Sequence, residues 1–168
     1  MTAPGAAPVT LLRALASECV ERCVSRYGAR LALVPDGEPI PHSHWGAPEA
    51  GLEGNRIYAR ADTPAHSLLH ELGHYVCMTP ARRARLVKDA GGDPDEECAV
   101  CYLQILLADH LRGFGRAKAL ADMDTWGYSF REGTAHAWWS GDARFARAWL
   151  LERRLIDSSD GVTWRLRA

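Results

Sequence analysis

The segment from Thr63 to Met78 constrains the fold more than any other part of this sequence. Thr63 and Pro64 are typical of a helix start, because a hydroxyl can cap the first turn and a proline loses no hydrogen bond there. Apolar side chains then recur at helical spacing at Ala65, Leu68, Leu69, Leu72 and Val76. His70 and His74 lie one turn apart on the other side. We therefore predict an amphipathic helix with one core face and one polar face.

Residues 70–74 read His-Glu-Leu-Gly-His, a spacing that suits a divalent metal ion. Two histidines four positions apart on a helix can direct both imidazoles to one ion. Glu71 lies about 100° around the helix from His70, where it can act on a water molecule without being a ligand. The motif predicts His70 and His74 as zinc ligands and Glu71 as a general base. Zinc suits such a site, although manganese, iron and cobalt remain possible native metals.

A catalytic zinc ion normally has three protein ligands and an open position for water. The third is expected from a second helix, which Asp93 and Pro94 begin. A stripe at helical spacing starts in this helix and comprises Glu97, Cys101, Gln104 and Ala108. Glu97 is therefore the predicted third ligand, with Glu96 as the alternative. Acidic residues in a first turn otherwise favour the helix dipole at the surface, which is how we interpret Asp95 and Glu96.

These residues resemble the ImmA/IrrE-type zinc metallopeptidases, which are small gluzincins. The likeness rests on His-Ser-Leu-Leu-His-Glu-Leu-Gly-His-Tyr at 66–75, after a short strand, and on the later acidic helix; it covers about residues 10–111. The family's usual Glu-Ala-Asn is Glu-Cys-Ala at 97–99 here. The resemblance implies a zincin-like fold, His70, His74 and Glu97 as zinc ligands, and Glu71 as the base.

The pattern as a whole predicts an α+β fold, in which a small mixed sheet packs on the metal-binding helix and on the glutamate-bearing helix. We expect a flexible tail at 1–9 and one domain at 10–168, with a core at 10–111 and a helical, aromatic region at 112–168. Helices are expected at 10–27, 63–78, 93–111, 116–123 and 142–156. Strands are expected at 30–34, 55–61 and 162–166. Loops are expected at 35–55 and 81–92.

The reaction that these residues predict is hydrolysis of a peptide bond in a protein or peptide substrate. Zinc would lower the pKa of water, Glu71 would accept the proton, and a further donor would stabilise the oxyanion. Candidates for this donor are His136, Tyr128, Arg131, His42 and His44. The strand at 55–61 is a candidate edge for pairing with an extended substrate. We interpret its two arginines, Arg56 and Arg60, as solvated side chains.

Other interpretations stay open. The chain could be a zincin-shaped regulatory or partner-binding protein with little hydrolytic activity, or its histidines could be ordinary polar residues. Glu71 favours hydrolysis, because a non-catalytic zinc site does not need that carboxylate. His66 is interpreted as supporting the site and Cys77 as packing beneath it. The five cysteines predict reduced thiols. A structural zinc site is the alternative for four of them, Cys19, Cys23, Cys98 and Cys101.

Composition limits the partners. A formal net charge of -1 gives no general attraction to nucleic acid. The tryptophans of the carboxyl-terminal region are expected to fill a core or line a pocket, and they comprise Trp126, Trp138, Trp139 and Trp149. No apolar stretch reaches the about 20 residues of a membrane span, and no secretory signal is evident. The cytoplasm is the expected compartment, and the oligomeric state stays open.

Overall fold

The computed structural model describes residues 8–86 and 91–168, and its described part contains seven α-helices, one short 3-10 helix and three strands. The strands are β1 (Arg30–Leu33), β2 (Gly51–Glu53) and β3 (Arg56–Ala59). The helices are the 3-10 helix η1 (Leu12–Ala14), α1 (Ser17–Ser25), α2 (Ala65–Cys77), α3 (Pro80–Ala84), α4 (Pro94–Ala108), α5 (Gly115–Trp126), α6 (Ala135–Gly141) and α7 (Arg144–Glu152).

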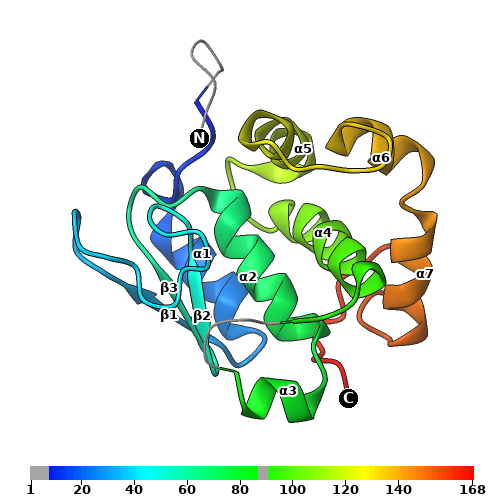
Figure 1. The fold of residues 1–168 in the computed structure, drawn as a ribbon, viewed down its shortest axis with the longest axis horizontal. Coiled ribbons are helices and arrows are strands. Elements are labelled where there is room, and N and C mark those ends of the chain that lie inside the picture. Colours follow the sequence, from blue (N-terminus) through cyan, green and yellow to red (C-terminus); the bar gives the residue numbers. More distant parts are fainter. Residues whose placement is uncertain (1–7, 87–90) are drawn as a thin grey trace.

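The sheet lies at one side of the molecule and α4 to α7 at the other, with α2 between them (Figure 1). Its order is β1-β3-β2, with β3 parallel to β1 and antiparallel to β2. This mixed sheet beside helices confirms the α+β class. The prediction that 55–61 forms an edge is wrong, because β3 is the central strand. It is central because β2, within the segment expected to be a loop, pairs Leu52 with Ile57.

The apolar face of α2 and nearly the whole circumference of α4 form the core. The predicted apolar stripe of α2 is fully buried, namely Ala65, Leu68, Leu69, Leu72 and Val76. α2 packs on β2, β3 and α4, and α4 packs in turn on α5 and α7. Burial of each large aliphatic side chain contributes about 1.5–3 kcal/mol. The two helices are therefore held rigidly side by side, which matters because both carry residues of the site.

α2 and α4 approach each other closely at Gly73. A Cβ atom built on Gly73 would lie 2.9 Å from Cγ1 of Val100 and 3.3 Å from its carbonyl oxygen. Val100 lies on α4 and is fully buried, so it has little room to retreat. A glycine inside a helix costs about 1 kcal/mol relative to alanine. The tight packing explains why glycine stands here.

We expect Gly73→Ala to lower the free energy of unfolding by about 1 kcal/mol, although alanine is the better helix former. Overpacking costs about 1–3 kcal/mol, which outweighs the gain of about 1 kcal/mol in propensity. The matched control is Gly141→Ala, because a Cβ at that helical glycine would meet nothing within 4 Å. Urea unfolding measures both variants. Equal stabilisation by both alanines would show that α2 and α4 are not in tight contact at Gly73.

The chain before α2 differs from the expected continuous helix at 10–27. The backbone N–H groups of Leu12 and Arg13 donate to carbonyls of residues 63 and 61, so η1 pairs with the segment leading into α2. Thr63 does not cap α2. Its hydroxyl accepts a hydrogen bond from the backbone of Arg60, while the first helical N–H, that of Ala65, donates to the carbonyl of Thr10. Backbone hydrogen bonds between distant segments thus replace the start of the helix predicted at 10–27 and the Thr63 cap predicted for α2.

The carboxyl-terminal half keeps the predicted helices at shifted bounds. Asp93 caps α4 as expected, by accepting a hydrogen bond from the backbone N–H of Glu96. The aromatic stretch contains a helix that was not predicted, α6, and the loop expected at 81–92 begins with α3. No strand forms at 162–166 in the described structure: Val162 makes one isolated bridge with Ile156, and Arg167 N donates to the carbonyl of Val76. The chain end thus docks on α2 and makes no sheet.

Residues 1–7 of the predicted tail and 87–90 of the predicted loop lie outside the described residues, whereas Val9 is already buried. None of the helices described here is long and apolar enough to cross a bilayer. All five cysteines are free, and the predicted alternative zinc site of Cys19, Cys23, Cys98 and Cys101 is not found among potential metal-binding groups of the described chain.

Candidate metal centre

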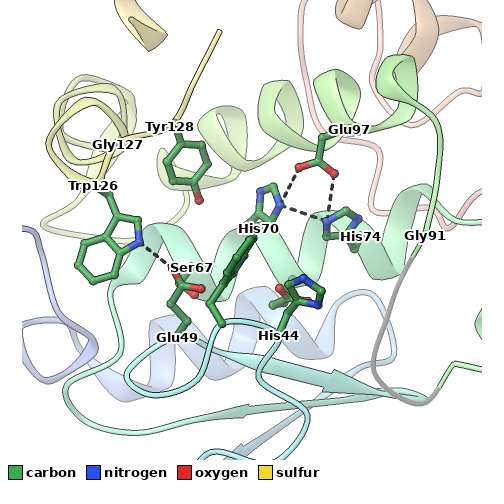
Figure 2. A pocket seen from close by; sticks show the side chains of 12 residues that line it. His44, Glu49, Ser67, His70, His74, Gly91, Glu97, Trp126, Gly127 and Tyr128 are labelled. Atoms are coloured by element: carbon green, nitrogen blue, oxygen red, sulfur yellow. Dashed lines mark hydrogen bonds and ion pairs between the residues drawn. The ribbon is translucent and has the colours of Figure 1, made fainter. Parts of the chain in front are cut away.

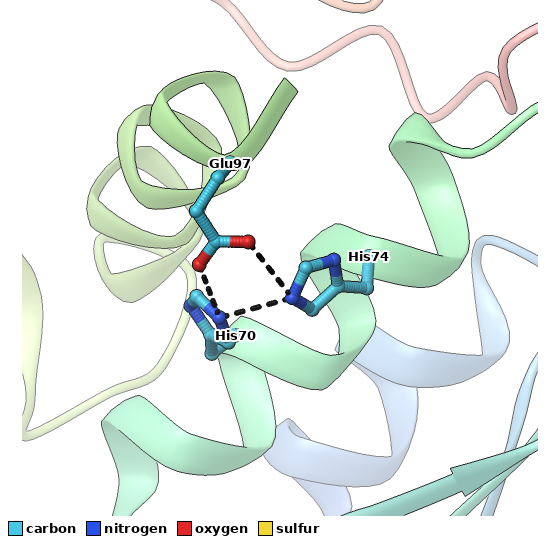
Figure 3. Close-up of side chains that lie close together, drawn as sticks. All are labelled: His70, His74 and Glu97. Atoms are coloured by element: carbon cyan, nitrogen blue, oxygen red, sulfur yellow. Dashed lines mark hydrogen bonds and ion pairs between the residues drawn. The ribbon is translucent and has the colours of Figure 1, made fainter. Parts of the chain in front are cut away.

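The structure brings three predicted ligands together between α2 and α4. His70 and His74 project from one face of α2, and Glu97 reaches down from the first turns of α4 (Figure 3). The two Nε2 atoms are 3.1 Å apart. Glu97 Oε1 lies 3.0 Å from Nε2 of His70, and its Oε2 lies 3.3 Å from Nε2 of His74. Three donor atoms therefore converge on one point.

This donor set fits a divalent metal ion. Two imidazole nitrogens and a carboxylate that face one point repel through their lone pairs unless a cation, either a proton or a metal ion, lies between them. Zinc bonds of about 2.0–2.2 Å in a tetrahedron place neighbouring ligand atoms about 3.3–3.5 Å apart. The observed separations are close to these values. His70, His74 and Glu97 can thus hold a metal ion.

Glu97 and Glu96, in the first turn of α4, differ in burial and in their partners. Side-chain exposure is 50% for Glu97 but only 4% for Glu96. Arg82 donates two hydrogen bonds of 2.8 and 2.9 Å to the Glu96 carboxylate, and Arg167 donates a third of 3.0 Å. The interpretation of Glu96 as a surface residue is therefore wrong. It is a buried ion-pair partner that ties α3 and the chain end to α4, and it is not among the donors that converge with the histidines.

Gln104 orients His70 from two turns further along α4. Its Oε1 lies 2.7 Å from Nδ1 of His70, so the imidazole donates there and keeps the Nε2 lone pair for a metal. The amide nitrogen donates to the carbonyl of His66 at 3.1 Å and to the hydroxyl of Tyr128 at 3.4 Å. These two acceptors determine which end of the amide faces His70. Gln104 is fully buried, as this positioning role requires.

Removing the amide should weaken metal binding while leaving the ligands in place. We expect Gln104→Leu to lower zinc affinity by about 10- to 100-fold, because the Nδ1–H group of His70 loses its acceptor. Gln104→Glu keeps an acceptor oxygen and should lose less. Competition with a chromophoric chelator measures the affinities, and thermal unfolding checks that both variants fold. Wild-type affinity in Gln104→Leu would show that the contact does not orient His70.

A cavity of about 480 Å³ opens beside these ligands (Figure 2). It is lined by His44, Trp45, Glu49, Ser67, His70, Glu71, His74, Gly91, Glu97, Trp126, Gly127 and Tyr128. Burial raises the pKa of Glu71 to about 7; the charge of His70 opposes this rise, and those of Glu49 and Glu97 add to it. A carboxyl group with a pKa near neutrality suits a group that exchanges protons at physiological pH. The predicted base therefore lies in the same cavity as the metal ligands.

Tyr128 is one of two predicted oxyanion donors that the structure brings to this cavity. Its ring centroid lies 5.8 Å from that of His70, and its hydroxyl is 3.1 Å from Nδ1 of His66. Burial raises the pKa of Tyr128 to about 12, so the phenol keeps its proton at neutral pH. Burial also lowers the pKa of His66 to about 3, which keeps that imidazole neutral. His66 supports Tyr128 and is not among the converging donors.

The other predicted donors lie elsewhere, with one exception. His44 lines the cavity. His136 lies on α6 with its Nδ1 2.6 Å from a carboxylate oxygen of Asp124, outside the cavity lining. Arg131 lines a second cavity beside α6 and α7, and His42 is 3.1 Å from the carboxylate of Glu53. The fold thus brings Tyr128 and His44 to the ligands and leaves the remaining three apart.

Sequence reasoning gave no role to two residues of this region, Gln104 and Glu49. Gln104 did carry a signal, because it is a polar residue two turns after Glu97 on an otherwise apolar helix. Trp126 was expected only to fill a core or line a pocket, and it does line the cavity. Glu49 had no local signal, since it lies in a loop whose path depends on tertiary contacts. Cys77 is buried, as expected of a packing residue.

Comparison of the chain with protein-family models, with curated proteins and with solved structures found no match.

Proposed function

We propose that this protein is a zinc-dependent peptidase with a zincin-like fold, related to the ImmA/IrrE-type metallopeptidases, that hydrolyses a peptide bond in a protein or peptide substrate. The observation that carries the proposal is the convergence of His70, His74 and Glu97 beside a cavity that also contains Glu71. Ligands alone would support only metal binding. A carboxylate next to the ligands, but not among them, supplies what a hydrolase needs in addition.

A bound zinc ion supplies Lewis acidity, which lowers the pKa of water and polarises a carbonyl group. Glu71 then accepts a proton from the attacking water at its carboxylate and delivers it to the leaving amine. The carboxylate is suited to both steps, because burial brings its pKa close to neutrality. Gln104 keeps His70 in the tautomer whose Nε2 is free for the metal. Each of these groups comes from α2 or α4, which pack rigidly together.

The hydrogen-bond pattern around Tyr128 supports it as the oxyanion donor. His66 Nε2 is buried and has no hydrogen-bond partner among the described residues. Burying an unpaired acceptor costs less free energy than burying an unpaired N–H group, so the unpaired Nε2 of His66 is the nitrogen without a proton. The proton is assigned to Nδ1, which donates it to the Tyr128 oxygen. That oxygen also accepts from Gln104. The hydroxyl hydrogen of Tyr128 thus remains for a substrate oxygen in the cavity.

The experiment is cleavage of a proteome-derived peptide mixture by zinc-loaded protein, with new termini identified by mass spectrometry. Chelator-treated protein is the control. We expect new termini only with the zinc-loaded protein, because hydrolysis depends on the zinc ion that the three ligands would hold. Zinc binding without any cleavage would instead favour a regulatory or partner-binding protein of the same shape. Cleavage that persists in the chelator-treated control would show that it does not depend on this metal centre.

A further inference from the structure

Glu49 is a carboxylate in the cavity without a cationic partner. It is half-buried, and its Oε1 accepts a hydrogen bond of 2.7 Å from Nε1–H of Trp126 (Figure 2). That donor is neutral, and no Arg or Lys pairs with Glu49 in the described chain. Removing a carboxylate from water is costly unless charges or hydrogen bonds compensate it. Glu49 therefore retains capacity to bind a cation.

The proposed metal centre does not provide this cation. A divalent ion carries two positive charges, which the carboxylates of Glu97 and Glu71 balance. Glu49 is then the remaining carboxylate of the lining, and the described lining residues include neither Arg nor Lys. With metal bound, the described lining therefore keeps one carboxylate whose charge the metal does not balance. A cationic group on a bound molecule would neutralise it.

Two tryptophans accompany this carboxylate. Trp45 lines the same cavity and is 80% exposed, so its ring is available to a bound molecule. Trp126 lines the cavity too and packs against His66 with ring centroids 5.2 Å apart. Aromatic rings attract ammonium and guanidinium groups through their negative faces. A carboxylate with tryptophans in one cavity is thus a composition that suits an organic cation.

Glu49 lies in a loop that is attached to the helix carrying the reacting groups. The next residue, Ala50, donates a backbone hydrogen bond of 3.0 Å to the hydroxyl of Ser67, one turn before His70 on α2. The loop is therefore tied to the metal-binding helix. Glu49 lines the same cavity as Glu71 and Tyr128. A cation bound to Glu49 would therefore lie in the cavity where the scissile bond is placed.

We propose that the substrate carries a cationic group, an ammonium or a guanidinium, beside the scissile bond, and that Glu49 binds this group with Trp45 and Trp126. The inference rests on the proposed function, since it names the substrate chemistry of the same site. The cation could be a Lys or Arg side chain or the free α-amino group of a peptide. Both share the chemistry that Glu49 recognises, and the following experiment separates them.

The probes are hydroxamates, which bind zinc through their own chelating group. Nα-acetyl-arginine hydroxamate carries a cationic side chain, and Nα-acetyl-citrulline hydroxamate is its neutral counterpart. Leucine hydroxamate and Nα-acetyl-leucine hydroxamate test the α-amino group in the same way. Isothermal titration calorimetry on zinc-loaded protein gives each Kd. We expect at least one cationic probe to bind about tenfold tighter than its neutral counterpart.

Variants assign the preference to the residues. Glu49→Gln removes the charge but keeps an oxygen for the indole of Trp126, so the loop should stay in place, and the preference should be lost. Trp45→Ala should reduce the preference, and because Trp45 is exposed the fold should not suffer. The matched control is Glu38→Gln, an exposed carboxylate outside the cavity lining, which should keep the preference.

The outcomes separate this inference from the proposed function. Equal Kd values for cationic and neutral probes, or a preference that survives Glu49→Gln, would overturn the cation site while leaving the zinc centre intact. If no hydroxamate binds, or if binding is the same in metal-free protein, the zinc centre itself fails and the inference fails with it. A preference for the arginine probe alone would identify a side chain, and one for leucine hydroxamate alone an amino terminus.

Discussion

Wild-type protein is expected to bind about one zinc ion per chain, whereas Glu97→Ala and His74→Ala should retain none after dialysis. Each variant leaves only two protein ligands at the site. Loss of residues that merely support the ligands typically costs about 10- to 100-fold in affinity, so loss of a ligand should exceed about 100-fold. Elemental analysis of protein purified without an affinity tag measures the stoichiometry, and chelator competition measures the affinity.

Two variants in the same turn of α4 are the controls. Asp95→Ala removes an exposed carboxylate next to Glu96 and should keep full zinc affinity. Glu96→Gln should also keep zinc, but it removes the negative charge with which Arg82 and Arg167 form ion pairs, so it should lower the melting temperature. Loss of zinc in Glu96→Gln together with retention in Glu97→Ala would mean that Glu96 is the ligand.

Zinc should also stabilise the fold. A ligand at about 100 times its Kd adds about 2.7 kcal/mol, which raises the melting temperature of a chain of this size by about 5–10 °C. Wild type and Asp95→Ala should show this increase, and Glu97→Ala should not. Differential scanning fluorimetry with and without zinc measures it. An identical increase in Glu97→Ala would show that zinc acts at another place.

Glu71→Gln is expected to keep zinc but to lower the rate of peptide hydrolysis by about a hundredfold to ten-thousandfold. The amide has almost the shape of the carboxylate, yet it cannot accept a proton from water. Glu71 is not one of the three converging donors, so metal content should equal that of wild type. The measurement is kcat/KM on a peptide that the wild-type protein cleaves, together with elemental analysis of both proteins.

The matched control for this variant is Glu38→Gln, which removes an exposed carboxylate outside the cavity lining. On the same peptide it should retain the hydrolytic rate of wild type. A general loss of negative charge would affect both variants alike, whereas loss of a base affects Glu71→Gln alone. Equal rates for Glu71→Gln and wild type would exclude Glu71 as the base.

The site residues on α2 and α4 could be predicted, because the face of a helix on which a residue lies depends only on its spacing from nearby residues. The four-residue spacing of His70 and His74 places both on one face wherever the helix lies, and the core stripe opposite them determines that this face points outward from the core. The same periodicity separated Glu97 from Glu96, which differ by about 100° around α4. The structure then brings Glu97 within 3.3 Å of both histidines.

The positions of residues in loops and short elements could not be predicted from such spacing. Tyr128 and His136 were equal candidates in sequence, but only Tyr128 lies in the cavity, because it follows α5 directly whereas His136 lies within α6. Glu49 lies in a segment rich in glycine and proline, whose path depends on pairing with β3 and on the hydroxyl of Ser67. Nothing in the neighbouring residues encodes those distant partners.

The helices α2 and α4, the α+β class and the chemical character of the polar face could be predicted from the sequence, because side-chain periodicity and the Asp93 cap act within a few residues. Tertiary structure alone decided the central place of β3, the start of α2 without a Thr63 cap, and the burial of Glu96 between two arginines. These features depend on backbone hydrogen bonds and ion pairs between segments far apart in the chain, whose geometry exists only once the core has packed.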